Sequence, residues 1–363
     1  MNNRNKDNPI VGIIANPASG RDVRRLVAQA SIFPTVEKSN MIQRILSSLG
    51  CVGVREVVMM PDTGGITARI RHAQETGKSH FARNWPTVHF LNMPIDDSEI
   101  DTICAVEQMV KLGVAAIIVM GGDGTHRVVA KVCGKTPLVA LSTGTNNTFP
   151  EIREATVAGL AAGLVATNKV RAEEVCLRNK VLHVDLNGAG HEIALVDLCV
   201  SSECWIGTRA LWQPNCLKEL FVTFASASSI GLSAIAGYLH PVNRWAAYGL
   251  RILLAPPGEG MFTVSVPIAP GLIEAVGVVE LKEIHPKEIC AFETHRGTIA
   301  FDGERSIEFN GCDRPRVWLE MEGPVTIDID KTMLKSAEDH LFVHHDDRGH
   351  SYNRNKKGVP MRT

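Results

Sequence analysis

In the first 150 residues, short apolar runs alternate with longer helix-like segments. Each run is continuously apolar rather than alternating, which is typical of strands that are covered on both faces. The lengths between the runs fit crossover helices, so the pattern predicts a doubly wound parallel sheet in an α/β domain over residues 10–168. The runs read IVGIIANP, VREVVMMP, VHFLNMP, AAIIVMGG and PLVALSTG.

The pattern then changes to many short strands separated by Gly and Pro turns. This predicts a β-rich second domain over residues 169–320, with a helical insertion near 214–238. Residues 321–345 contain VTIDID and KTMLKSAEDHLF, which predict a last strand and helix that return to the first domain. We expect residues 1–9 and the polar tail 346–363 to be disordered.

Composition favours a folded, cytoplasmic protein with small-molecule partners. Lys plus Arg (38) nearly balances Asp plus Glu (39), which argues against nucleic acid or an anionic membrane as partner. The nine cysteines form no CxxC pair and fit reduced thiols in a cytosol, and the polar N-terminus has no export signal pattern. Residues 220–239 carry no charge but contain serines and glycines, so we expect a buried helix rather than a membrane span.

Two segments match a P-loop only in part. GK[ST] occurs at residues 77–79 and 134–136, but the glycine required upstream is replaced by His72 and Val129, respectively. No GxGxxG motif follows a predicted strand. The chain therefore needs a different arrangement to bind phosphate.

The sequence IIVMGGDGT predicts a buried strand, a glycine turn and a helix. Gly121, Gly122 and Gly124 allow a sharp turn that brings backbone N–H groups close to a phosphate. Thr125 can cap the helix, whose positive end favours an anion. A carboxylate such as Asp123 would be repelled there unless it holds Mg²⁺ or takes a proton from an attacking hydroxyl. The alternative is an ordinary strand-to-helix turn, in which these residue types are common.

In this setting GGDGT resembles the signature of the superfamily that joins NAD kinases with diacylglycerol and sphingosine kinases. Three further motifs fall in the order of that superfamily: NPASG at 16–20 resembles a nucleotide loop, LSTGTNNTF at 141–149 resembles GTGNDFA, and FDGE at 301–304 resembles a segment returned to the cleft. The likeness is strongest to the acetoin-catabolism protein X type of the ATP-NAD kinase family, through ALVD at 194–197 and GTRALW at 207–212.

The resemblance implies a Rossmann-like N-terminal domain, a β-sandwich C-terminal domain, ATP in the cleft between them and a homo-oligomeric assembly. It implies that Asp123 activates the acceptor hydroxyl and that Asp302 and Glu304 contact Mg²⁺ or the acceptor. The residues that it assigns to the nucleotide or the acceptor are Asn16, Ser19, Gly20, Gly121, Gly122, Gly124, Thr125, Gly144, Thr145, Asn146, Asn147 and Asp197.

The chain departs from the family pattern at two places. Asn147 stands where the lipid-kinase branch has a metal-linked Asp, and Val196-Asp197 stands where many NAD kinases have an Asn-Glu pair. An amide binds Mg²⁺ less strongly than a carboxylate does. Metal binding would therefore depend on the carboxylates of GGDGT and DGE.

The sequence thus favours an ATP- and Mg²⁺-dependent kinase of a hydroxyl acceptor, with NAD as the leading acceptor and a link to acetoin catabolism. A nucleotide-sensing protein that has lost efficient transfer and a lipid kinase are the alternatives. Single motifs also have alternatives without function: NPASG as a strand-ending turn, Asp302-Gly303 as a hairpin turn, and Asp197 as a solvent-facing strand residue.

Overall fold

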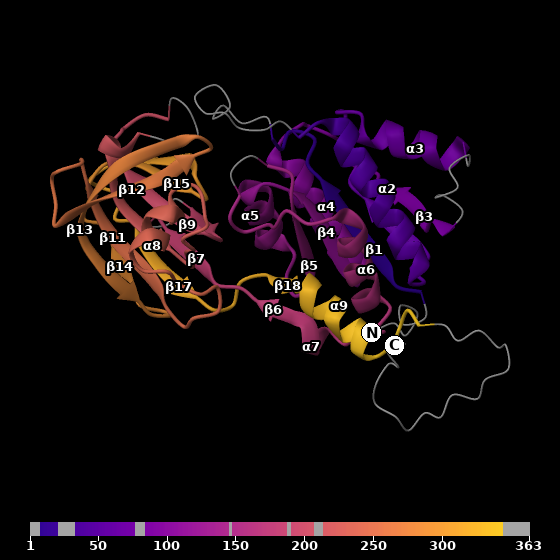
Figure 1. The fold of residues 1–363 in the computed structure, drawn as a ribbon. Coiled ribbons are helices and arrows are strands. Elements are labelled where there is room, and N and C mark those ends of the chain that lie inside the picture. The colour runs from indigo at the N-terminus through magenta and orange to yellow at the C-terminus, as the bar shows by residue number, and fades with distance from the viewer. Residues whose placement is uncertain are drawn as a thin grey trace.

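The computed structural model consists of an α/β region and a β-rich region that lie side by side (Figure 1). It describes residues 8–20, 33–76, 84–144, 147–186, 190–206 and 213–343. The predictions for residues 1–7 and for the tail 346–363, for Thr145 and Asn146, and for the GTRALW segment fall on residues outside these ranges.

The α/β region contains one sheet, which in the described residues has seven strands in the order β3-β2-β1-β4-β5-β18-β6. All neighbours are parallel except β18 and β6. Strands β1 and β4 are buried on both faces, which explains their continuously apolar sequences. The strands are β1 (Ile10–Ala15), β2 (Glu56–Met59), β3 (Thr87–Phe90), β4 (Ala116–Gly121), β5 (Leu138–Ser142), β6 (Cys176–Arg178) and β18 (Val325–Ile327).

Helices cover both faces of this sheet. Helices α2 and α6 share one core cluster with the sheet, and α4 and α5 share another on the opposite face. Small residues let α6 lie close to α2, because a methyl group on Gly159 would come within 3.0 Å of Ile45 Cα. The helices are α2 (Thr35–Cys51), α3 (Ile66–Thr76), α4 (Glu99–Leu112), α5 (Asp123–Val132), α6 (Ala155–Ala166), α7 (Ala172–Val175) and α9 (Ile329–Glu338).

The β-rich region is a sandwich of two antiparallel sheets. Within the described ranges, the large sheet has the order β12-β13-β11-β10-β9-β15-β16 and the small sheet the order β14-β17-β7-β8. Apolar side chains from both sheets form one core between them. The strands are β7 (Val181–Asp185), β8 (His191–Ala194), β9 (Asp197–Ser201), β10 (Leu217–Val222), β11 (Gly249–Ala255), β12 (Phe262–Ala269), β13 (Leu272–Ile284), β14 (Cys290–Ala291), β15 (Gly297–Phe301), β16 (Glu304–Phe309) and β17 (Arg316–Glu320).

The two-region architecture confirms the predicted fold class, but the helical insertion near 214–238 and the single buried helix over 220–239 are wrong. Only a short 3₁₀ turn (Pro214–Cys216) and α8 (Ser233–Leu239) are helical there. Strand β10 lies between them, paired on both sides in the middle of the large sheet. A strand buried on both faces has the same apolar run as a buried helix, which explains the error. In the part of the chain that the structure describes, no helix is long and apolar enough to cross a membrane.

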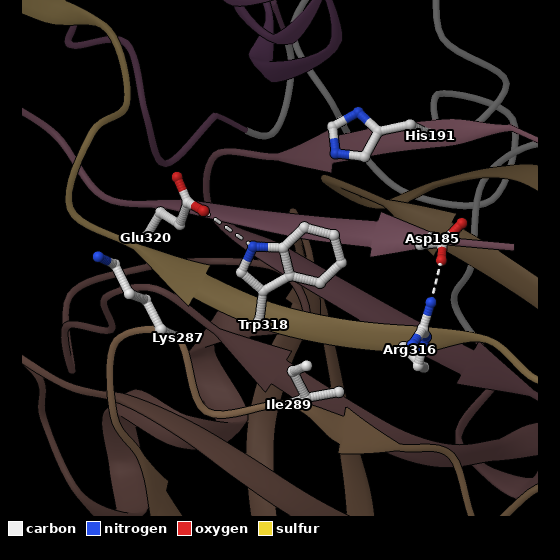
Figure 2. Close-up of a pocket in the computed structure, with 7 residues that line it drawn as sticks. All are labelled: Asp185, His191, Lys287, Ile289, Arg316, Trp318 and Glu320. Carbon is white, nitrogen blue, oxygen red and sulfur yellow. Dashed lines mark hydrogen bonds and ion pairs between the residues drawn. The ribbon is translucent and has the colours of Figure 1, made fainter. Parts of the chain in front are cut away.

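A shared apolar cluster joins the two regions. Phe149 of the α/β region packs in it with Val181, Ile193 and Phe224 of the β-rich region. Strand β18 pairs with β5, so the chain returns to the α/β sheet after the sandwich. The outward face of the small sheet also carries a pocket around Trp318 (Figure 2).

Candidate functional site

The strand order of the α/β sheet reverses between β1 and β4, because β2 and β3 continue on one side and β5 on the other. Ligands of open α/β sheets bind at the carboxyl ends of strands at such a switch point. The loops that follow β1 and β4 are NPASG and GGDGT, and they are in contact: Asn16 Nδ2 donates to Thr125 Oγ1 over 2.9 Å. The geometry brings together two motifs that are far apart in the sequence.

A lysine that sequence patterns did not indicate holds the NPASG loop through hydrogen bonds to its backbone carbonyls. Lys38 of α2 is 1% exposed, and its ammonium donates to the carbonyls of Asn16, Pro17 and Ser19 at 3.0, 3.0 and 2.8 Å. The loop is a turn closed by Asn16 Oδ1, which accepts the Ala18 N–H over 2.8 Å. The predicted strand-ending turn is therefore present, and it lies beside the GGDGT loop.

In the NPASG loop, two predicted nucleotide-binding residues lie toward the end of β5. The Ser19 and Thr143 hydroxyls are 2.8 Å apart, and Gly20 adopts the left-handed conformation with φ 77°. Asn147 donates from Nδ2 to Ser142 Oγ over 2.6 Å. A methyl group on Gly144 would lie 2.6 Å from Asn147 Oδ1, so this amide packs against the glycine backbone.

The GGDGT loop contains the first turn of α5. Gly122 is the N-cap residue and Asp123 the first residue of the helix. A methyl group on Gly121 would lie 2.5 Å from Thr125 Cβ, so the close turn requires glycine there. The fully buried His126 imidazole donates from Nδ1 to the Gly122 carbonyl over 2.9 Å, and burial lowers the pKa of His126 to about 4. His126 is thus a neutral side chain that fixes the loop.

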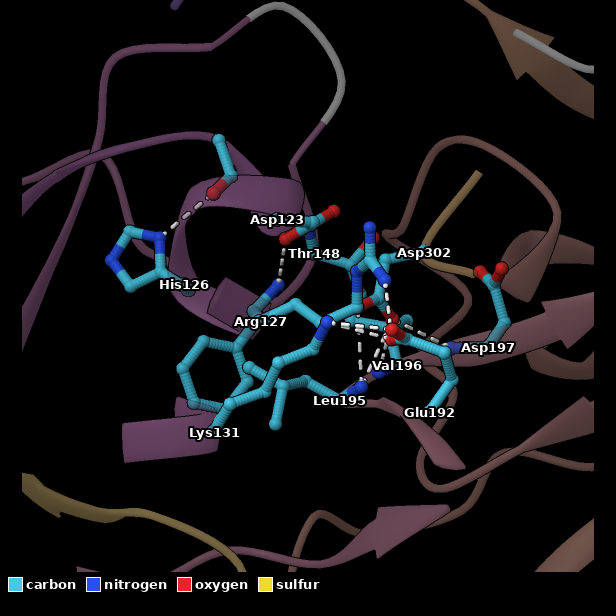
Figure 3. A network of polar contacts seen from close by, with 12 residues as sticks. Asp123, His126, Arg127, Lys131, Thr148, Glu192, Leu195, Val196, Asp197 and Asp302 are labelled. Atoms are coloured by element: carbon cyan, nitrogen blue, oxygen red, sulfur yellow. Dashed lines mark hydrogen bonds and ion pairs between the residues drawn. The ribbon is translucent and has the colours of Figure 1, made fainter. Parts of the chain in front are cut away.

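Asp123 is 7% exposed and has a defined orientation. Its carboxylate accepts the backbone N–H groups of Thr148 and Phe149 at 3.0 and 2.8 Å (Figure 3). Arg244 of the β-rich region holds the same peptide segment, since it donates to the Thr148 and Phe149 carbonyls at 3.1 and 2.9 Å. Its guanidinium lies 4.3 Å from the ring centre of Phe224. Arg244 was not found from the sequence, because no local motif surrounds it.

The Asp302-Gly303 pair forms the two-residue turn between β15 and β16, with φ values of 51° and 81°. Two positive φ angles are those of a type I′ hairpin turn, so the hairpin alternative is correct as a description of the backbone. The turn nevertheless faces the α/β region. A methyl group on Gly124 would lie 3.5 Å from Glu304 Oε2, so the Glu304 carboxylate lies over the first turn of α5.

The Asp302 side chain is buried inside the protein. Its carboxylate accepts the N–H groups of Leu195 and Val196 at 3.0 and 2.8 Å, and Arg127 Nε lies 3.9 Å away (Figure 3). Burial raises the pKa of Asp302 to about 6, although Arg127 and the backbone donors lower it. Asp197 follows this segment at the start of β9 and is 5% exposed, so it is not a solvent-facing strand residue.

Two protein-family models match consecutive parts of the chain. The ATP-NAD kinase N-terminal domain matches residues 11–169, and the acetoin catabolism protein X C-terminal domain matches residues 180–322. A relative from Cupriavidus necator with the name acetoin catabolism protein X is 42% identical over 340 residues, which cover 92% of this chain and 94% of that relative. The chain belongs to the acetoin catabolism protein X family. This membership confirms the resemblance inferred from the motifs.

The solved structures that match this chain include two kinases. The crystal structure of yeast NADH kinase complexed with NADH has a TM-score of 0.48 and 12% identity, over 96% of this chain and 90% of that chain. The crystal structure of an NAD kinase from Archaeoglobus fulgidus in complex with ATP has a TM-score of 0.33 and 18% identity, over 80% of this chain and 99% of that chain.

For this member of the acetoin catabolism protein X family, the described residues contain no group of three or more His, Cys, Asp or Glu side chains that could hold a metal ion. Asp302 does not fit its predicted role as a metal ligand, because its oxygens face N–H donors inside the protein. Glu304 does lie over the first turn of α5. Mg²⁺ commonly binds through one or two carboxylates, water and substrate phosphates, and this donor set fits that mode but not an all-protein cage.

Proposed function

We propose that this member of the acetoin catabolism protein X family is an ATP-dependent kinase that transfers a phosphoryl group to a hydroxyl acceptor, with NAD as the leading acceptor. The observation that carries the proposal is the orientation of Asp123 at the switch point. Its carboxylate, on the first residue of α5, is held by two backbone N–H groups, and Glu304 lies next to Gly124 in the same turn. Such a carboxylate can take the proton of an attacking hydroxyl.

The other parts of the site support the same chemistry. The start of α5 and the glycine backbone provide N–H groups and a positive helix end for phosphate oxygens. The NPASG loop, fixed by Lys38, lies next to them and would contact the nucleotide. Mg²⁺ bound to the triphosphate would offset negative charge on the transferred group, and Glu304 is the carboxylate best placed to hold it.

The direct test is to incubate the purified protein with Mg-ATP and NAD and to detect NADP by mass and by a coupled dehydrogenase. The variant Asp123→Asn should reduce turnover about 10²- to 10⁴-fold. Asp101→Asn is the matched control, because Asp101 is also a buried aspartate in a helix's first turn that accepts a backbone N–H, from Asp96 over 2.9 Å. Equal turnover of D123N and wild type would reject Asp123 as the base.

A second candidate function is nucleotide sensing without efficient transfer. It is favoured by Asn147, whose amide lies between Gly122 and Gly144. The amide stands where the lipid-kinase branch has a metal-linked aspartate. In that case ATP would raise the melting temperature while no acceptor became phosphorylated. An acceptor panel with NAD, NADH, small alcohols and a sphingoid base separates this outcome from NAD kinase and lipid kinase activity.

A further inference from the structure

The outward face of the small sheet carries a pocket that takes no part in the contacts around Asp123. Its volume is about 390 Å³, within the range of small-molecule sites. The side chains come from β7, β8 and β17 and from the turn before β14 (Figure 2). The lining residues are Asp185, His191, Lys287, Ile289, Arg316, Trp318 and Glu320.

The floor of the pocket is a rigid aromatic surface. Trp318 donates from Nε1 to Glu320 over 3.0 Å and stacks on His183, with ring centres 5.3 Å apart and planes inclined by 12°. His183 in turn lies 2.9 Å from His191, nitrogen to nitrogen. Ile289 adds an aliphatic wall and is 63% exposed. Flat apolar surfaces that are fixed before binding favour a planar ring.

Three of the four acidic and basic side chains that line the pocket, Asp185, Arg316 and Glu320, have a polar partner. Arg316 pairs with Asp185 over 2.6 Å, and the Glu320 carboxylate accepts the indole N–H and lies 3.6 Å from His183 Nε2. Among the residues that the structure describes, no carboxylate lies within 4.0 Å of the Lys287 ammonium. The free cation at the rim therefore favours an anionic group on the ligand.

The backbone holds Lys287 at this position. Its φ angle is 69°, which is uncommon for a residue with a side chain and would suit glycine better. The Lys287 N–H donates to the Leu319 carbonyl over 2.8 Å, which ties the turn to β17 beside Trp318. Residues with a side chain in this conformation occur at ligand sites, and here the conformation fixes Lys287 beside the pocket.

We propose that this pocket is a second ligand site, which binds a planar aromatic ring carrying one anionic group. The ring stacks on Trp318 against Ile289, and the anionic group contacts Lys287. None of the lining residues takes part in the contacts around Asp123, so the proposal does not depend on kinase activity.

The test uses the full chain labelled with 5-fluorotryptophan and benzoate as the probe. The sequence has five tryptophans, and the Trp318 fluorine signal is assigned with Trp318→Phe. Benzoate at millimolar concentrations should shift the Trp318 signal saturably, and cyclohexanecarboxylate should shift it less because its ring is not planar. Lys287→Met should weaken benzoate binding about two- to fivefold, the effect of an exposed charge.

Lys282→Met is the matched control, because Lys282 is an exposed lysine on β13 paired with Glu280 and outside the lining. It should leave benzoate binding unchanged. The proposal is overturned if the Trp318 signal shows no saturable shift, or if K287M and K282M bind benzoate equally. Tighter binding of N-methylpyridinium than of benzoate would also overturn it, since the pocket would then select cations.

Discussion

Arg244 provides a test of whether the β-rich region positions Asp123. The side chain of Arg244 is partly buried, and desolvation lowers the pKa of its guanidinium, which donates to the carbonyls of Thr148 and Phe149. Hydrogen bonds to charged groups contribute about 1.5–3 kcal/mol each. Arg244→Met keeps an apolar side chain and removes the desolvation penalty of the guanidinium, which partly offsets the lost hydrogen bonds. We therefore expect the free energy of unfolding to fall by about 2–3 kcal/mol.

The same substitution should also affect catalysis. The N–H groups of Thr148 and Phe149 orient Asp123, so a shift of this segment moves the carboxylate. A displacement of about 1 Å can cost roughly 10²-fold in rate. In R244M we therefore expect kcat for NADP formation to fall about 10- to 100-fold, with a smaller change in KM for ATP. Both constants are measured under conditions in which a urea titration shows the variant to be fully folded.

The matched control is Arg251→Met. Arg251 also lies over a phenylalanine ring, 5.6 Å from the centre of Phe221, and donates to the buried Glu219 over 2.8 Å, but it lies within the sandwich. R251M should lose stability while the folded protein keeps its kcat. If R244M and R251M lower stability alike and neither changes kcat, Arg244 is a structural residue and the positioning argument is refuted.

Three further outcomes are expected. Lys38→Met should lower the free energy of unfolding by about 2–4 kcal/mol and weaken ATP binding, because three backbone carbonyls lose their donor. The control Lys111→Met, at an exposed lysine, should have neither effect. Urea titration measures the stability and calorimetry the ATP binding. Burial raises the pKa of Asp302 from 3.8 to about 6, so the stabilisation by its protonated form is present below about pH 4 and is lost as pH rises to 6. Urea titrations at several pH values should show the wild type losing about 2–3 kcal/mol of unfolding free energy over this range. The dependence of stability on pH should be flatter in Asp302→Asn. Glu304→Gln should raise the Mg²⁺ concentration for half-maximal rate without changing the free energy of unfolding by more than about 1 kcal/mol. An unchanged Mg²⁺ dependence would contradict the assignment of Glu304 to Mg²⁺.

Features that depend on neighbouring residues in the chain could be predicted from the sequence. The GGDGT and NPASG loops follow strands whose apolar runs are continuous, and parallel strands place such loops at one edge of the sheet. The Asp-Gly pair likewise predicts its own turn. In each case the local sequence determines both the backbone conformation and the position of the loop.

Features that depend on distant contacts could not be predicted. Lys38 is one of several helix lysines, and only the packing of α2 under the NPASG loop buries its ammonium. Arg244 lies in a loop without a motif, and its partners are about a hundred residues earlier in the chain. The sequence predicts a helix where β10 forms, because the apolar run does not reveal the pairing on both sides that decides its conformation.

The Asp302-Gly303 turn shows why a structural and a functional interpretation need not exclude each other. Asp302 binds the N–H groups of Leu195 and Val196, and this fixes the turn against the start of β9. With the turn fixed, β16 begins at Glu304 and its carboxylate lies over α5. Asp302→Ala should therefore loosen both the turn and the Glu304 position, whereas E304Q removes only the charge. Stability loss confined to D302A, with an altered Mg²⁺ dependence in both variants, would separate the anchoring role from the role in the cleft.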